Sequence, residues 1–226
     1  MRKIVKTSEP YTLINYRSRI PKKNKLDSNI YNDFPDKNKS DCNSNKSGNL
    51  RKQLLEDQGY ICCYCMQRIS CDNSRIEHFK SQEHNRKYQI QYKNLFVACN
   101  NSHGKSFAEQ HCDVRKADID LTTKLNLSSS SSINEIKYRN DCTIYSDDND
   151  INTDINNILN LNLEIIKKSR LQALNNLTQC IRVWDKNTLD KLIQKYSIKN
   201  SEGKYAEFSE MLVWKLKKKV RQYGNI

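Results

Sequence analysis

The cysteines constrain this chain more than any other feature of its sequence. The 226 residues include nine cysteines and four histidines. The N-terminal residues contain no continuous apolar run typical of a signal peptide, so we expect a cytoplasmic protein whose thiols stay reduced and without disulfides. An odd number of cysteines also fits a disulfide framework poorly. All four histidines and most of the cysteines fall in one segment, namely Cys62, Cys63, Cys65, Cys71, Cys99 and Cys112 with His78, His84, His103 and His111.

The spacing within this segment predicts a structural zinc site. Cys62-x2-Cys65 is a spacing at which two thiolates on one tight turn reach the same tetrahedral ion. Cys99 and Cys112 are the best second pair, although a longer loop separates them than in a zinc knuckle. Three alternatives for individual ligands stay open, namely His103, His111 and Cys63, and so does a set of reduced thiols without metal. Cys42, Cys142 and Cys180 stand apart and are expected to be ordinary thiols.

Composition indicates a basic protein with a modest core. Lys and Arg number 39 against 26 Asp and Glu, a formal net charge of +13, which favours a polyanionic partner such as nucleic acid. A Lys- and Asn-rich composition without functional meaning is the alternative. Hydrophobic residues make up 36% of the chain, below the usual ~45–50%. The sequence contains no run of about 18 apolar residues, so we expect no membrane-spanning helix.

Local patterns predict several elements. A helix is expected from the N-cap Asn49 to Gly59, and a hairpin around the turn-prone pair Asn140-Asp141. The run Ser128–Ser132 is typical of a flexible connection. A helical pattern begins near Ile155, with Asn160 or Asn162 as its N-cap, and a last helix runs from about Phe208 to Val220.

These patterns divide the chain into four parts. Residues 1–47 form an N-terminal arm and a polar loop, and residues 48–126 hold the cysteine-rich segment. Residues 127–150 contain the serine run and the small hairpin. Residues 151–226 are helical. We expect an α+β fold in which two short strands and a helix are embedded among other helices.

Three short motifs within the cysteine-rich segment carry candidate chemistry. Glu77-His78 ends a short apolar strand, Asn94 leads into a strand that ends on Cys99, and Asp113 follows Cys112 where a helix begins. Each has an ordinary structural explanation: a histidine near a strand end, an amide that caps a turn, or an acid at a helix N-terminus. Their order and spacing together favour a catalytic site.

That order resembles the HNH nuclease motif. The resemblance implies a ββα-metal core, in which two strands and a helix bind one divalent ion and a four-cysteine zinc ties the ends together. It assigns His78 as the general base, Asn94 as the residue that fixes the loop, and Glu77 and Asp113 as ligands of Mg²⁺ or Mn²⁺. Glu77 stands where the family more often has Asp, and Asp113 where it more often has His or Asn. Arg115 and Lys116 are expected either to contact phosphate or to form a solvated surface pair.

The resemblance extends over most of the chain. The sequence is similar to the PtuB-like HNH subunit of Septu-type anti-phage systems and to retron-associated HNH effectors. That family works with an ABC-type ATPase, the PtuA-like subunit. The phrases that carry this similarity are IVKTSEPYTLINY, LRKQLLEDQGYICCYC, IEHF, HCDVRKAD and ILNLNLEIIKKSR.

The expected function is therefore metal-dependent hydrolysis of phosphodiester bonds, with DNA favoured as substrate. Two alternatives remain: an HNH effector that cleaves tRNA or other RNA, and a non-catalytic zinc module that binds nucleic acid. A protein–protein adaptor with an inactive nuclease site is a weaker third. HNH chemistry needs no 2′-hydroxyl, so the motif itself does not choose between DNA and RNA.

Overall fold

The computed structural model describes residues 1–21, 26, 30–35 and 49–223. Most of the polar loop predicted over residues 21–47, including Cys42, lies outside the described residues. The α-helices are α1 (Tyr11–Arg19), α2 (Leu50–Gln58), α3 (Cys112–Lys116), α4 (Ser130–Asn134), α5 (Asn149–Thr153), α6 (Glu164–Gln179), α7 (Lys186–Ser197) and α8 (Ser209–Tyr223). The strands are β1 (Ser74–His78), β2 (Leu95–Cys99), β3 (Lys137–Tyr138) and β4 (Ile144–Tyr145).

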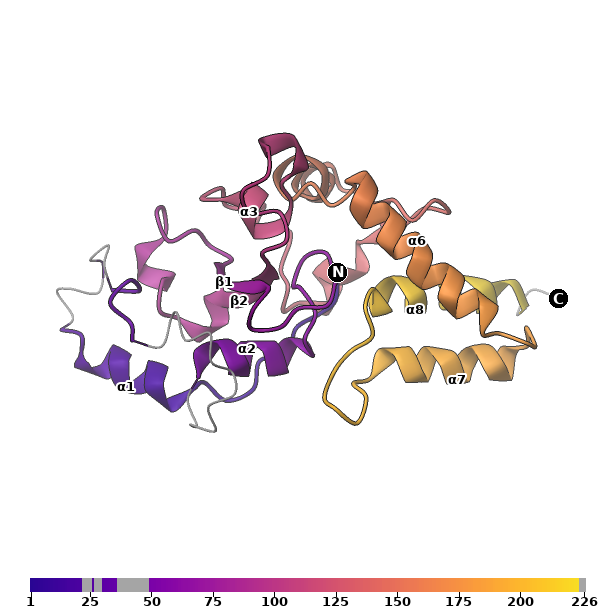
Figure 1. Ribbon diagram of the computed structural model, residues 1–226, viewed down its shortest axis with the longest axis horizontal. Helices are drawn as coiled ribbons and strands as arrows, with labels where there is room; N and C mark the ends of the chain where they lie inside the picture. Colours follow the sequence, from indigo (N-terminus) through magenta and orange to yellow (C-terminus); the bar gives the residue numbers. More distant parts are fainter. Residues whose placement is uncertain (22–25, 27–29, 36–48, 224–226) are drawn as a thin grey trace.

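The antiparallel pair β1–β2 lies in the middle of the molecule (Figure 1). Its register places Ser74 opposite Cys99 and His78 opposite Leu95, so one end of the pair carries a cysteine and the other a histidine. Every side chain of β2 is buried, because α2 and α3 both pack against this strand. As predicted, Glu77-His78 forms the end of one strand, β1, and Asn94 directly precedes another, β2.

Helix α2 begins and ends where the sequence predicted. The Asn49 side chain accepts a hydrogen bond from the Lys52 backbone N–H, and Gly59 follows the helix in the left-handed conformation. A side chain at Gly59 would also collide with the Tyr205 ring, 2.4 Å from the position of an added Cβ. The turn after α2 leads directly to Cys62.

The helical C-terminal third differs in detail from the prediction. Helix α5 continues into a π-helical turn over Asp154–Ile158, and α6 starts only at Glu164, after Leu163. The expected N-cap at Asn160 or Asn162 is wrong: the Asn162 side chain instead bonds the backbone of Ile144 in strand β4. Helix α7 lies against α8, and the three helices α6–α8 gather at one end of the molecule (Figure 1).

Of the two predictions for residues 127–150, the hairpin is correct and the flexible serine run is not. The hairpin β3–β4 around Asn140-Asp141 is confirmed. The serine run is not a flexible connection but forms most of helix α4, where Ile133 is buried and the Ser132 hydroxyl donates to the carbonyl of Lys124. A serine run has no apolar pattern of its own, so its neighbour Ile133 supplies the packing that holds it.

The described fold is thus a mixture of helices and two small antiparallel sheets, and a cluster of buried apolar side chains extends from the N-terminal segment to α8. None of the helices in the described part of the chain is long and apolar enough to cross a membrane. Cys71 is disulfide-bonded, which corrects the expectation that no cysteine would be. The four-part division of the chain stays a prediction.

Candidate functional site

Four buried cysteines converge beside the central strands. Their Sγ atoms, from Cys62, Cys65, Cys99 and Cys112, all lie within 4.8 Å of one another. Cys62 and Cys65 come from the turn after α2, Cys99 from the last position of β2 and Cys112 from the first position of α3. The ligand set predicted from the sequence is therefore brought together, and the group could bind a metal such as zinc.

The distances within this cluster suit a tetrahedral zinc ion. A Zn–S distance of about 2.3 Å places neighbouring sulfurs about 3.8 Å apart, and the Cys62–Cys112 and Cys65–Cys99 pairs are separated by 3.8 and 3.7 Å. The Cys99 backbone N–H also points at Cys62 Sγ, 3.3 Å away. Burial opposes ionisation of Cys62, but hydrogen bonds from Cys112, Cys63 and the other thiols hold the pKa of Cys62 well below its ordinary value.

The three alternative ligands take other positions. His111 lies beside the cluster, with Nδ1 3.3 Å from Cys112 Sγ and 3.8 Å from Cys99 Sγ, where it can donate a hydrogen bond to a thiolate. Cys63 is buried but is not one of the four converging thiols. His103 lines a separate cleft.

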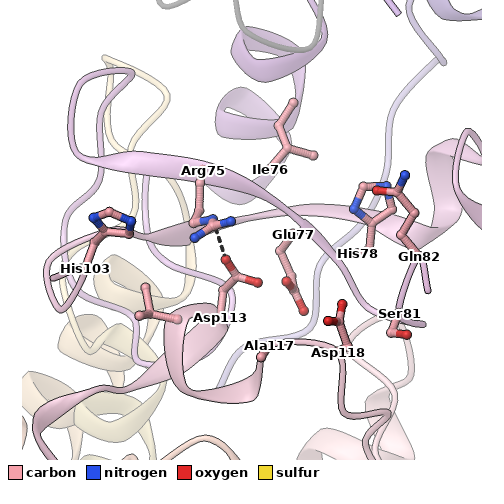
Figure 2. A pocket seen from close by; sticks show the side chains of 11 residues that line it. Arg75, Ile76, Glu77, His78, Ser81, Gln82, His103, Asp113, Ala117 and Asp118 are labelled. Carbon is pink, nitrogen blue, oxygen red and sulfur yellow. Dashed lines mark ion pairs between the residues drawn. The ribbon is translucent and has the colours of Figure 1, made fainter. Parts of the chain in front are cut away.

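That cleft, of about 430 Å³, opens between β1 on one side and α3 with the segment that follows it on the other. Figure 2 shows Glu77, Asp113 and Asp118 pointing into it, with His78 at one end and His103 at the other. Its lining residues are Arg75, Ile76, Glu77, His78, Ser81, Gln82, His103, Asp113, Val114, Ala117 and Asp118. Three of the residues predicted for catalysis thus share one cleft, namely Glu77, His78 and Asp113.

The two predicted metal-binding carboxylates are each paired with a cation. Glu77 Oε1 lies 3.0 Å from Lys116 Nζ, and Asp113 Oδ2 lies 2.6 Å from Arg75 Nε. Asp113 Oδ2 is buried and accepts no well-oriented hydrogen bond, so a divalent ion that bound this oxygen would displace the Arg75 contact. Burial raises the pKa of Glu77 well above its usual range, the charge of Asp113 raises it further, and Lys116 and Tyr64 act in the opposite direction.

His78 is held in one tautomer. Its Nε2 lies 3.0 Å from the carbonyl oxygen of Gln89, and a carbonyl can only accept, so Nε2 carries the proton and Nδ1 is left as the acceptor. The ring also packs edge-on against Tyr31, with centroids 4.3 Å apart. Burial lowers the pKa of His78 to about 4, so the imidazole is neutral near pH 7.

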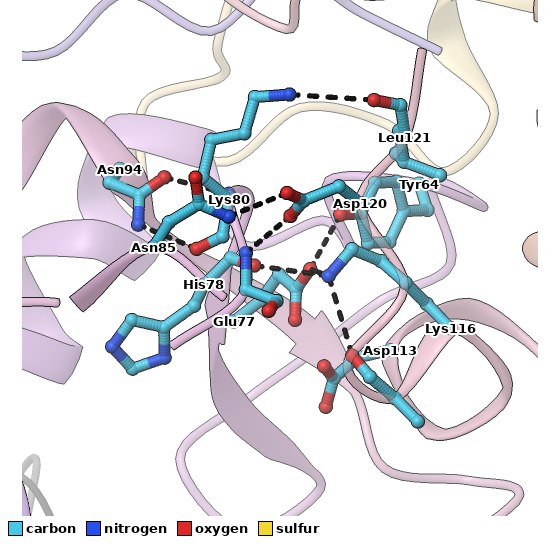
Figure 3. Close-up of polar contacts among 12 residues, drawn as sticks. Tyr64, Glu77, His78, Lys80, Asn85, Asn94, Asp113, Lys116, Asp120 and Leu121 are labelled. Carbon is cyan, nitrogen blue, oxygen red and sulfur yellow. Dashed lines mark hydrogen bonds and ion pairs between the residues drawn. The ribbon is translucent and has the colours of Figure 1, made fainter. Parts of the chain in front are cut away.

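Asn94 fixes the loop that orients His78 (Figure 3). Its Oδ1 accepts from the Lys80 backbone N–H at 2.8 Å, and its Nδ2 donates to the Lys80 carbonyl at 3.0 Å. Nδ2 also lies 3.3 Å from the carbonyl of Tyr88. Lys80 follows His78 closely and Tyr88 directly precedes Gln89, so one amide ties together both ends of the loop.

Arg115 and Lys116 are not a solvated pair. The Lys116 side chain is 1% exposed, bonds Glu77 and donates to the carbonyl of His78 at 3.1 Å. Arg115 lies over the Phe107 ring, 3.4 Å from its centroid, and donates to the carbonyl of Asn157. Lys116 therefore stabilises the residues that form the cleft. Its ammonium could contact a phosphate directly only if its ion pair with Glu77 were broken.

Sequence reasoning missed three groups around the cleft. Asp118 is a third carboxylate in it, Arg75 pairs with Asp113, and the buried Tyr64 hydroxyl donates to Glu77 at 2.7 Å. A signal existed for Asp118, because it ends the phrase HCDVRKAD. Tyr64 sits between two zinc-spaced cysteines, and nothing in the sequence indicates that it reaches β1.

Comparison with models of known protein families gives no match, and no curated protein matches the chain significantly. The similarity to PtuB-like HNH subunits therefore stays a prediction carried by the motifs quoted above.

Proposed function

We propose that this chain is a metal-dependent HNH endonuclease, in which β1, β2 and α3 form a ββα-metal core. The observation that carries the proposal is the cleft in which a neutral, oriented His78 lies beside the carboxylates Glu77 and Asp113. A zinc module that only binds nucleic acid needs the four cysteines but has no use for this arrangement.

Each residue has a distinct role in the proposed reaction. Asp113 and Glu77, with Asp118 close by, are the residues that would hold Mg²⁺ or Mn²⁺, both of which prefer oxygen ligands. When bound, the ion would stabilise negative charge on the phosphate oxygens. His78 Nδ1 takes a proton from the attacking water while the Gln89 carbonyl keeps the ring in place. Asn94 maintains this geometry by holding the loop.

The test is cleavage by wild-type and His78→Ala proteins. Each is incubated with Mg²⁺ on duplex DNA, single-stranded DNA and total tRNA, with and without the ATPase partner. We expect His78→Ala to keep its zinc and fold and to lose cleavage by about 10²–10⁴-fold, the usual contribution of a general base. The substrate that is cleaved distinguishes a DNA nuclease from an RNA nuclease.

The matched control is His84→Ala, which removes an exposed histidine of the same segment that does not line the cleft. Its cleavage should equal that of the wild type. Undiminished cleavage by His78→Ala would refute the HNH assignment, and binding without cleavage by both wild type and variant would favour the non-catalytic zinc module.

We further propose that the chain acts in an anti-phage complex with an ABC-type ATPase. The support is the family resemblance, together with helices α6–α8, which extend beyond what the cleft and the cysteine cluster require. Co-expression of the two proteins should give one species on size-exclusion chromatography at low salt. Separate migration of the two proteins would refute the partnership.

A further inference from the structure

A second cleft, of about 620 Å³, lies between α8 and the β3–β4 hairpin, and it shares no lining residue with the candidate catalytic cleft. We call it the α8 cleft and define it by Tyr138, Tyr145, Trp214, Lys217, Lys218 and Arg221. Figure 1 shows that α8 belongs to the end of the molecule where α6–α8 gather, away from the central strands.

Three aromatic side chains line the α8 cleft, namely Tyr138, Tyr145 and Trp214. Trp214 is partly exposed and packs edge-on against the buried Tyr138, whose ring centroid is 6.0 Å away at an interplanar angle of 66°. Tyr145 of β4 is also partly exposed and lines the cleft from the hairpin. Trp214 is therefore held in place by packing while part of its surface remains accessible, as a stacking platform requires.

The rim of the α8 cleft is positively charged. Lys217, Lys218 and Arg221 are exposed on the last turns of α8, and none of them is ion-paired within the part of the chain that the structure describes. Glu210, the one carboxylate among the described residues that line the cleft, is paired with Arg2 at 3.1 Å. Lys137 is likewise neutralised by Asp147. The three cations can therefore meet an anionic ligand, and Lys218 Nζ also lies 5.5 Å from the centroid of the Trp214 ring, a contact that a stacked base would share or displace.

We infer that the α8 cleft binds a single-stranded nucleic acid, with a base against Trp214 and the adjoining phosphates on Lys217, Lys218 and Arg221. The aromatic side chains that line the cleft can stack with a base, and the cations at its rim can contact phosphates. A duplex keeps its bases paired and cannot place one against Trp214. An acidic peptide would use the cations but has no planar group for the platform. The inference concerns binding alone, and it holds or fails independently of cleavage.

Trp214 itself supplies the readout. The chain has two tryptophans, and Trp184 lies between α6 and α7 outside the α8 cleft. In a Trp184→Phe, His78→Ala protein, Trp214 is the sole tryptophan and no substrate is consumed. Titration with oligothymidylate should quench its fluorescence. A base-free deoxyribose-phosphate strand, a duplex and polyglutamate should bind more weakly and leave the fluorescence unchanged.

Two sets of variants test the two halves of the site. Lys217→Gln/Lys218→Gln should weaken binding and reduce the slope of log affinity against log salt by about 1.4, at ~0.7 per phosphate contact on a single strand. The control pair Lys191→Gln/Lys195→Gln removes the same charge from exposed positions on α7 and should change neither. Trp214→Leu, followed by anisotropy of a labelled strand, should lower affinity by roughly 5- to 150-fold. Tyr145→Leu on the opposite wall should also lower affinity and serves as the second variant if Trp214→Leu fails to fold.

The inference is overturned by any of three results. The first is oligothymidylate binding that leaves Trp214 fluorescence unchanged. The second is an equal loss of affinity in the α7 control pair, which would indicate a nonspecific effect of charge. The third is polyglutamate or the base-free strand binding as tightly as oligothymidylate, which would make the cleft a general polyanion or acidic-peptide site.

Discussion

Lys116 Nζ lies 3.0 Å from Glu77 Oε1, and the two side chains are only 1% and 2% exposed. This buried pair joins α3 to β1 at the candidate catalytic cleft, which Glu77 itself lines. Tyr64 and the His78 carbonyl contribute further hydrogen bonds to the same two groups. The pair is therefore a structural link between the helix that carries Asp113 and the strand that carries His78, alongside the Arg75–Asp113 contact.

Removing one member of this pair should destabilise the protein strongly. We expect Lys116→Met to lower the free energy of unfolding by about 3–5 kcal/mol, because it leaves a buried carboxyl without its cation. The double variant Glu77→Gln/Lys116→Met should cost less than the sum of its single changes, since no charge is then left unpaired. Urea unfolding followed by circular dichroism measures the free energy of unfolding of the two single variants, Lys116→Met and Glu77→Gln, and of the double variant. The exposed control Lys93→Met should stay within about 0.5 kcal/mol of wild type, and additive effects would mean that the two groups do not interact.

Asp113→Asn should raise the Mg²⁺ concentration needed for cleavage. The amide keeps the shape of the side chain but removes the charge that attracts the ion. Cleavage rates across a Mg²⁺ titration test this. The zinc content should stay the same, because the proposed zinc ligands are the four cysteines. An unchanged Mg²⁺ requirement would remove Asp113 from the ligand set.

Asn94→Ala should slow cleavage less than His78→Ala does. Asn94 transfers no proton, and its loss frees the loop that carries Gln89, a misplacement that costs at most about 10²-fold. The Mg²⁺ requirement should remain that of the wild type, which separates a positioning role from metal binding. Gln91→Ala, which removes an exposed amide from the same loop, is the control and should cleave like the wild type. A loss as large as that of His78→Ala would assign Asn94 a direct part in the chemistry.

The elements that the sequence predicted correctly are those with strong local signals. Helix α2 carries both its cap residues, Asn49 and Gly59, within its own sequence. The hairpin at Asn140-Asp141 follows from its turn residues in the same way. The cysteine spacing favoured Cys62, Cys65, Cys99 and Cys112 as the ligands of a metal ion. It could not exclude His103 and His111, because that requires knowing that the end of β2 and the start of α3 lie side by side.

The features that could not be predicted depend on partners distant in the chain. Lys116 looked like half of a surface pair with Arg115, because nothing near it indicates that Glu77 neutralises its charge in the interior. Helix α6 begins at Glu164 rather than near Asn160, because Asn162 is used to bond strand β4. Tertiary contacts of this kind leave no trace in local sequence.

Loss of a cysteine ligand should unfold the region around the cleft. Cys62 and Cys112 connect the turn after α2 to α3, and structural zinc contributes folding free energy directly. Cys112→Ser should therefore lose both bound zinc and cooperative thermal unfolding. Cys180→Ser, which changes an exposed free cysteine, should lose neither. Well-folded wild-type protein without zinc by elemental analysis would contradict this prediction.

Lys6 should make stability depend on pH. Its ammonium lies 4.2 Å from the Phe96 ring centroid and 4.7 Å from that of Tyr92. Burial lowers the pKa of Lys6 to about 7, against the opposing effects of Asp57 and Cys63.

Between pH 7 and about 10.5, the unfolded chain therefore binds more protons at this residue than the folded protein does. The free energy of unfolding should rise with pH across that window, by at most about 1.4 kcal/mol per pH unit for one proton, and this contribution should be constant below pH 7. Lys6→Met has no proton to release, so its stability should rise less between pH 7 and pH 9 in urea unfolding. Lys3→Met, at an exposed position, should keep the wild-type dependence. Parallel pH profiles for Lys6→Met and wild type would show that the Lys6 ammonium stays charged in the folded protein.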